Sequence, residues 1–137
     1  MSDNSYRALV VDDEPIVRKM TIHALGQEGF FCDAADSGLE AGRMAESNRY
    51  DVVVTDLRMP NGHGHALATE LLTLEHHPLV IVVTGMAEPR LLKDLIGCGV
   101  DGVEFKPLRY DLFAAKVKAM VDHYRGIRIN YLEPLIS

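Results

Sequence analysis

The chain has 137 residues, of which 47% are hydrophobic and 25% charged, which suits one globular domain with a sizeable core and excludes disordered and fibrous classes. Its formal net charge is −6 and no stretch is rich in lysine or arginine, so we expect no direct nucleic-acid partner. There is no apolar run of the roughly 20 residues that a membrane span needs, and no secretory signal at the start. We therefore expect a cytoplasmic protein with no membrane partner.

Five short apolar runs predict β-strands. Continuous runs of this length, rich in β-branched residues, are typical of strands that are covered on both faces, as in a parallel sheet. The predicted strands, in chain order, are Ala8–Val11, Phe30–Ala35, Val52–Thr55, Val80–Thr84 and Gly102–Phe105.

Segments with helical periodicity separate these strands. The first helix starts at Pro15, which suits an initial turn, and stops before Gly29, while Ser37 is a suitable cap for the second. The resulting order, strand then helix five times over, predicts an α/β fold with a doubly wound parallel sheet. Residues 1–124 form one domain, and 125–137 are a tail or the start of a linker. The four later helices are predicted at Leu39–Ser47, His65–Leu74, Glu88–Cys98 and Arg109–Tyr124.

Polar residues follow the predicted strands where each one ends. The carboxyl ends of parallel strands meet at one edge of the sheet, so side chains far apart in the chain should gather there. These residues are Asp12, Asp13 and Glu14 after the first strand, Asp56 after the third, Thr84 at the end of the fourth and Lys106 after the fifth.

This set of residues suits phosphoryl transfer. Clustered carboxylates repel one another unless a cation lies among them, and hard oxygen ligands suit Mg²⁺. A metal ion, the Lys106 ammonium and the Thr84 hydroxyl around one carboxylate would stabilise the charge on a transferred phosphoryl group. Asp56 is then the nucleophile, and an aspartyl phosphate is the product.

With these residues in place, the chain resembles the response-regulator receiver domains of two-component signalling, over residues 6 to about 124. The D-x-x-M-P signature of that family reads Asp56-Leu57-Arg58-Met59-Pro60, and a later family glycine falls on Gly64. Residue by residue, the family's acidic pair falls on Asp12 and Asp13, its phosphoacceptor on Asp56, its hydroxyl residue on Thr84 and its lysine on Lys106.

The resemblance implies a flavodoxin-like (βα)5 fold with strand order 2-1-3-4-5. It also implies Mg²⁺ or Mn²⁺ held by Asp12, Asp13, Asp56 and the main-chain carbonyl of Arg58, and a cis bond between Lys106 and Pro107. The expected partners are a sensor histidine kinase or phosphotransfer protein and a downstream effector or effector domain. Such a domain is not an enzyme beyond catalysing its own phosphorylation and dephosphorylation.

One position departs from the family pattern. Receivers usually carry an aromatic residue three positions before the lysine, and here that position is Val103, which has no ring to reorient. We expect the helix from Glu88, the strand around Val103 and the helix from Arg109 to form the face that responds to phosphorylation. That face would bind a partner protein, or a second copy of the chain to form a homodimer.

Plainer interpretations exist for each of these residues. Asp13 suits a helix cap, Thr84 an ordinary strand position and Lys106 a solvated surface. His63 and His65 suggest a soft-metal site but lack a third ligand nearby, and two distant cysteines predict free thiols. Among other functions, a haloacid-dehalogenase-type phosphatase requires D-x-D where this chain has Asp12-Asp13-Glu14. A flavin or nucleotide binder requires a phosphate loop that is missing, and a non-phosphorylated scaffold would have lost the acceptor or the lysine.

Overall fold

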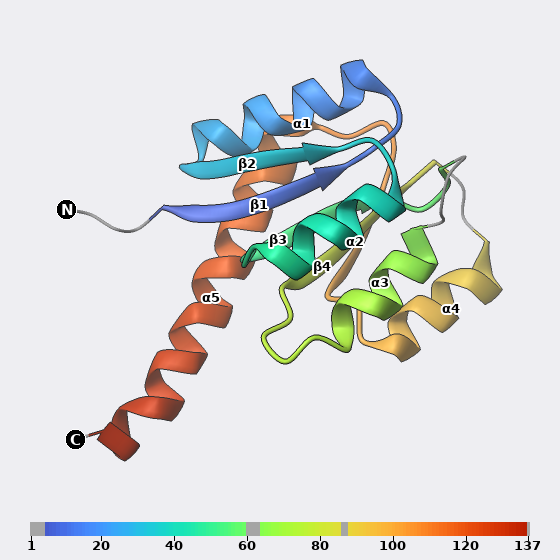
Figure 1. The fold of residues 1–137 in the computed structure, drawn as a ribbon. Helices are drawn as coiled ribbons and strands as arrows, with labels where there is room; N and C mark the ends of the chain where they lie inside the picture. Colours follow the sequence, from blue (N-terminus) through green and yellow to red (C-terminus); the bar gives the residue numbers. More distant parts are fainter. Residues whose placement is uncertain (1–4, 60–63, 86–87, 137) are drawn as a thin grey trace.

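The computed structural model describes residues 5–59, 64–85 and 88–136, with side chains described as far as residue 126. Five parallel strands form one sheet in the order β2-β1-β3-β4-β5, which confirms the predicted fold class and strand order (Figure 1). The elements in chain order are β1 Tyr6–Val11, α1 Pro15–Gln27, β2 Phe30–Ala35, α2 Gly38–Ser47, β3 Val52–Asp56, α3 Gly64–Leu72, β4 Leu79–Thr84, α4 Pro89–Cys98, β5 Gly102–Phe105 and α5 Tyr110–Ile136.

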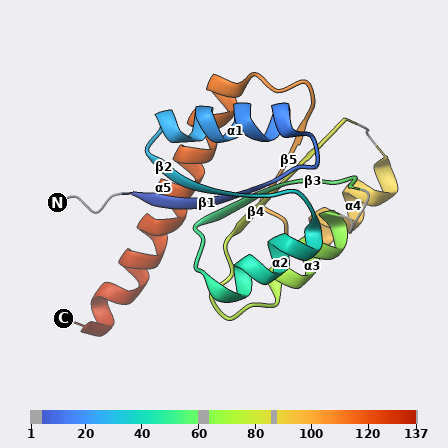
Figure 2. The same cartoon turned by 45° about the horizontal axis from the view of Figure 1, so that its top comes forward.

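Helices cover both faces of the sheet. Alternate residues of each strand point to opposite sides, so an apolar strand presents apolar side chains to the helices on both faces. Val53 packs with residues of α2, α3 and α4, whereas its neighbours Val52 and Val54 pack with residues of α1 and α5. Figure 2 shows these two layers, with α1 above the sheet and α2 and α3 below it. β3 and β4 are buried along their whole length, which explains the apolar runs Val52–Val54 and Leu79–Val83 that precede their polar ends.

The first helix starts at the predicted residue, and the other four start within one residue of the predicted positions. Ser37 caps α2, and its hydroxyl accepts a hydrogen bond from the main-chain N–H of Glu40. The N-cap residue of α1 is Glu14, with no side-chain cap, so the alternative interpretation of Asp13 as the cap of this helix is wrong. Pro15 at the first turn needs no N–H partner and already has helical φ, which suits this start.

Helix α5 is longer than predicted. We expected it to end at Tyr124, yet it runs unbroken to Ile136 and projects beyond the sheet (Figure 1). Gly126 lies inside the helix, and a glycine there costs only about 1 kcal/mol relative to alanine, which is too little to end a helix by itself. Among the residues that the structure describes, no helix combines the length and the apolar character of a membrane span.

Candidate functional site

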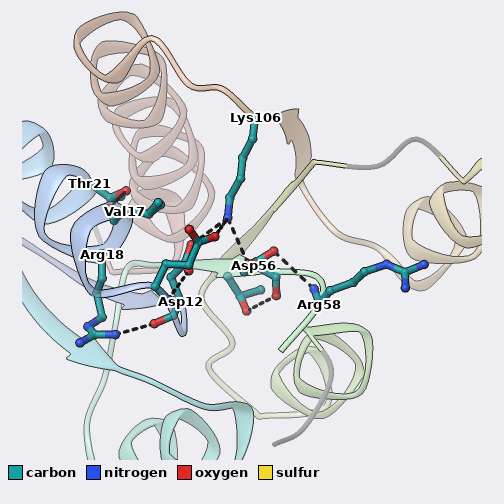
Figure 3. Close-up of polar contacts among 9 residues, drawn as sticks. Asp12, Val17, Arg18, Thr21, Asp56, Arg58 and Lys106 are labelled. Carbon is teal, nitrogen blue, oxygen red and sulfur yellow. Dashed lines mark hydrogen bonds and ion pairs between the residues drawn. The ribbon is translucent and has the colours of Figure 1, made fainter. Parts of the chain in front are cut away.

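The ends of four elements converge at one edge of the sheet. Asp12 follows β1, Asp56 is the last residue of β3, Thr84 is the last residue of β4, and Lys106 follows β5. The strand register brings them level, because Asp56 lies opposite Val83 on β4 and the Lys106 N–H donates to the Thr84 carbonyl at 2.9 Å. Residues predicted from separate parts of the sequence therefore lie side by side (Figure 3).

Lys106 is the centre of this group. Its Nζ lies 3.1 Å from Asp56 Oδ2, 3.2 Å from Asp12 Oδ2 and 3.5 Å from Glu14 Oε1. Both aspartate side chains are less than a tenth exposed, and that of Lys106 is one-fifth exposed. Burial disfavours the charge on Lys106, but its hydrogen bonds and ion pairs with Asp56 and Asp12 outweigh this, so its pKa is raised. Lys106 is thus a fixed positive charge at the sheet edge and not a solvated surface lysine.

Four carboxylates surround the same point. Asp12, Asp13, Glu14 and Asp56 each offer an oxygen, and these atoms all lie within 4.8 Å of one another. Burial raises the pKa of Asp12, an effect that its hydrogen bond from the Glu14 N–H and the charge of Lys106 oppose. One ammonium does not balance four carboxylates, and a hard divalent cation with oxygen ligands suits such a cluster. Glu14 was not among the predicted ligands, although its position directly after Asp13 was the available signal.

Main-chain contacts hold the Asp56 carboxylate in place. The N–H of Arg58 donates to Asp56 Oδ1 at 3.3 Å, which leaves Oδ2 facing Lys106. The start of α3 approaches the end of β3 closely, since the Gly64 N–H donates to the Leu57 carbonyl at 3.0 Å. A Cβ on Gly64 would lie only 2.1 Å from the Asp56 carbonyl oxygen, so this position requires glycine.

The start of α1 is fixed in a similar way. Asp12 Oδ1 accepts the Glu14 N–H at 2.9 Å, and the guanidinium of Arg18 donates to the Asp12 carbonyl at 2.7 Å (Figure 3). These contacts orient the remaining oxygen of Asp12 towards Lys106.

Thr84 is 1% exposed at the end of β4, so its hydroxyl lies inside the edge of the sheet and not on its surface.

Some predicted features lie elsewhere. His65 lies on α3 beside Leu57, Arg58 and Leu91, and within the described residues the acidic cluster includes no histidine or cysteine. Pro60 and His63 are outside the described residues. Cys32 and Cys98 are both free thiols, as predicted. The Lys106–Pro107 bond is cis, as the resemblance implied.

Similar proteins identify the class to which this fold and site belong. The backbone matches a CheY-like response regulator receiver domain protein from Methanospirillum hungatei with a TM-score of 0.85, at 24% sequence identity, over 90% of this chain and 98% of that chain. It matches the signal receiver domain of a signal transduction histidine kinase from Syntrophus aciditrophicus with a TM-score of 0.78, at 28% identity, over 86% of this chain and 91% of that chain. The class is therefore that of the receiver domains.

The sequence assigns the family directly. Residues 8–118 match the response regulator receiver domain model, and the chain belongs to that family. It is 31% identical over 129 residues to the sensor histidine kinase RcsC of Escherichia coli K12, over 93% of this chain and 14% of that protein. It is 28% identical over 130 residues to the transcriptional regulatory protein SrrA of Staphylococcus aureus, over 95% of this chain and 54% of that protein. The chain thus spans only about one-seventh and one-half of the length of these two relatives.

Proposed function

We propose that this receiver domain accepts a phosphoryl group on Asp56. One carboxylate oxygen of Asp56 attacks the phosphorus of a phosphohistidine or a small phosphodonor. The O–P bond forms as the bond to the donor's leaving group breaks. The observation that carries this proposal is the position of Lys106 Nζ, 3.1 Å from Asp56 and 3.2 Å from Asp12 at a buried strand end. An ammonium held there would pair with the charge of the new phosphate.

A divalent metal ion fits the same site. Asp12, Asp13 and Asp56, with the main-chain carbonyl of Arg58, are the proposed ligands for Mg²⁺ or Mn²⁺, and the clustered carboxylate oxygens support this. When bound, the ion supplies positive charge that offsets the repulsion between the carboxylates and the incoming phosphoryl oxygens. Thr84 is proposed to donate a hydrogen bond to the phosphoryl group. The domain would catalyse only its own phosphorylation and dephosphorylation.

Labelling with acetyl phosphate in the presence of Mg²⁺ tests this proposal. Asp56→Asn should abolish the labelling. The matched control is Asp36→Asn, because Asp36 follows β2 at the same edge of the sheet but is exposed and lies outside the acidic cluster. Labelling that persists in the Asp56→Asn protein would refute the assignment of the acceptor. Loss of labelling in both variants would show that the assay responds to surface charge.

We propose that α4, β5 and α5 carry the response. Each of these elements exposes a large apolar side chain: Ile96 is 65% exposed, Phe105 is 49% exposed and Leu112 is 55% exposed. A partner or a second copy would cover them, and an effector or effector domain fits the transcriptional regulators among the relatives. The phosphodonor would be a sensor histidine kinase or phosphotransfer protein, which fits the kinase relatives. Direct binding of nucleic acid or membrane is not part of the proposal.

We also propose that the domain ends near residue 124 and that 125–137 are a C-terminal tail or the start of a linker. Two observations support this boundary. The family match ends at residue 118, and Val121 and Tyr124 on α5 still pack against the core.

Hydrogen exchange with and without beryllofluoride tests whether α4, β5 and α5 respond to phosphorylation. Changes confined to the loops at Asp13, Asp56 and Lys106 would contradict the proposed α4–β5–α5 face.

A further inference from the structure

A second polar cavity lies at the opposite end of the sheet from Asp56. It has a volume of about 470 Å³ and is formed by the start of β1, the α2–β3 loop, the α3–β4 loop and α5. In Figure 1 this is the end from which the strand arrows start. β3 separates it from Asp56 by four residue steps, which is roughly 13 Å. The cavity is within the size range of small-molecule sites and does not overlap the phosphoacceptor.

The cavity carries positive charge on a protein whose formal net charge is −6. Its lining has the guanidinium groups of Arg7, Arg49 and Arg125 and the carboxylate of Asp51. Asp33 pairs with Arg7 from behind the lining, so three positive charges face two negative ones and one net positive charge remains. Asp51 holds Arg125 through contacts of 3.1 and 2.7 Å to Oδ1. Its other oxygen accepts the main-chain N–H of Arg7 at 2.7 Å. The one carboxylate of the lining is therefore already committed.

The three guanidinium groups differ in how they are held. Arg7 is fixed by Asp33 at 3.0 Å and by the ring of Tyr50, whose centroid is 5.2 Å away, and Arg125 is fixed by Asp51. Arg49 is exposed and has no ion pair within the described part of the chain. Two arginines are thus positioned in advance, and a third is available to a ligand.

Two imidazoles complete the wall. His76 and His77, from the α3–β4 loop, also line the cavity, and His77 Nδ1 lies 3.1 Å from the Pro78 carbonyl. A neighbouring hollow of about 330 Å³ shares Arg49 and His76 but is also lined by Glu46 and Glu75. An anion would be repelled from that hollow, so the larger cavity is the favoured one.

We propose that this cavity binds a small polyanion, specifically a compound that carries a phosphate or diphosphate group. Arginine forms paired hydrogen bonds with phosphate oxygens, and guanidinium groups from three separate segments can surround one such group. Because Arg125 belongs to α5 and Arg49 to the α2–β3 loop, the bound anion would join the last helix to the start of the sheet. This inference is independent of phosphorylation at Asp56.

Isothermal titration with inorganic pyrophosphate, in magnesium-free buffer at low salt, is the test. We expect a single site whose affinity falls as salt is added. Arg49→Ala should weaken binding about tenfold or more, because it removes a charge-assisted contact without breaking an ion pair. The matched control is Arg90→Ala, an exposed arginine of α4 outside the cavity, which should bind as the wild type does. Asp56→Asn should also bind normally, which separates this site from the phosphoacceptor.

Three results would overturn the proposal. The first is no detectable binding at millimolar pyrophosphate. The second is an equal loss of affinity in Arg49→Ala and Arg90→Ala, because that would reflect total charge and not this cavity. The third is binding of citrate without binding of pyrophosphate, which would identify a carboxylate ligand in place of a phosphorylated one. Thermal melting of Arg49→Ala checks folding, and His76→Ala provides a second variant of the same wall.

Discussion

Replacing Gly64 with alanine should damage both the stability and the chemistry of this domain. The new Cβ would lie 2.1 Å from the Asp56 carbonyl oxygen, 2.9 Å from Leu57 Cα and 3.0 Å from the Asp56 carbonyl carbon. All three are main-chain atoms, so no side chain can rotate away. Ordinary contact begins at about 3.4 Å, and the start of α3 and the end of β3 must therefore separate by about 1.3 Å, from 2.1 to 3.4 Å.

The magnitude follows from this forced movement. Overpacking of this kind typically costs 1–3 kcal/mol, and we expect the free energy of unfolding to fall by about that amount. The Gly64 N–H to Leu57 carbonyl hydrogen bond would be strained at the same time. A displacement of about 1 Å at a reacting group can lower a rate about 100-fold, so labelling of Asp56 by acetyl phosphate should slow by about 10- to 100-fold.

Urea unfolding and the rate of acetyl phosphate labelling measure the two effects. The matched control is Gly26→Ala, because a Cβ on Gly26 has nothing within 4 Å and this residue lies inside α1. That change should raise stability by up to about 1 kcal/mol and leave the labelling rate unchanged. If Gly64→Ala were as stable and as reactive as the wild type, the close approach to Asp56 would not be a constraint on this site.

Three further predictions concern single residues. Lys106→Met should lower the melting temperature in EDTA, because Asp12 and Asp56 are left buried without their ammonium partner. Mg²⁺ should raise the melting temperature of this variant more than that of the wild type, and equal shifts in the two proteins would argue against metal binding by the acidic cluster. Asp13→Asn should weaken Mn²⁺ binding, measured by electron paramagnetic resonance, with little change in unfolding free energy, and unchanged affinity would remove Asp13 from the ligand set. Burial and a hydrogen bond to a carboxylate raise the pKa of Tyr50 to about 12, above an unfolded value of about 10, so the fold favours the neutral phenol. This contribution to stability is complete below pH 10 and is lost as the pH rises towards 12. Urea unfolding should show a shallower loss in Tyr50→Phe, and parallel losses in both proteins would contradict this.

The strands of the sheet could be predicted from the sequence because helices cover both faces of the sheet. The run from Val52 to Thr55 needs to be apolar throughout, and this made the strand and its polar exit at Asp56 visible without a structure. The parallel topology then placed Lys106 beside Asp56 although 50 residues separate them. Local residue pattern and topology together therefore located the candidate site.

Other features depended on packing that local patterns do not contain. Ile16 and Met20 are apolar residues of α1, but they are 73% and 47% exposed, while Leu25 of the same helix is fully buried. Periodicity shows that a helix has an apolar side but not how far its neighbours reach along it. Glu14 was expected at this edge of the sheet, but its contact with Lys106 at 3.5 Å depends on the turn that follows β1. These are tertiary effects, and so is the continuation of α5 past Gly126.

The unbroken α5 has a consequence for anything fused to its end. Its 27 residues are about 40 Å long, and among the residues whose side chains the structure describes, Tyr124 is the last that packs against the hydrophobic core. Each residue of a helix turns the chain by about 100° and advances it by 1.5 Å, so the receiver fixes the angular phase of whatever follows Ile136. One inserted residue would rotate a fused domain by about 100°, whereas seven would return it to within about 20° of its original direction. The orientation of a fused domain relative to the receiver would thus depend on the number of residues in the helix between them.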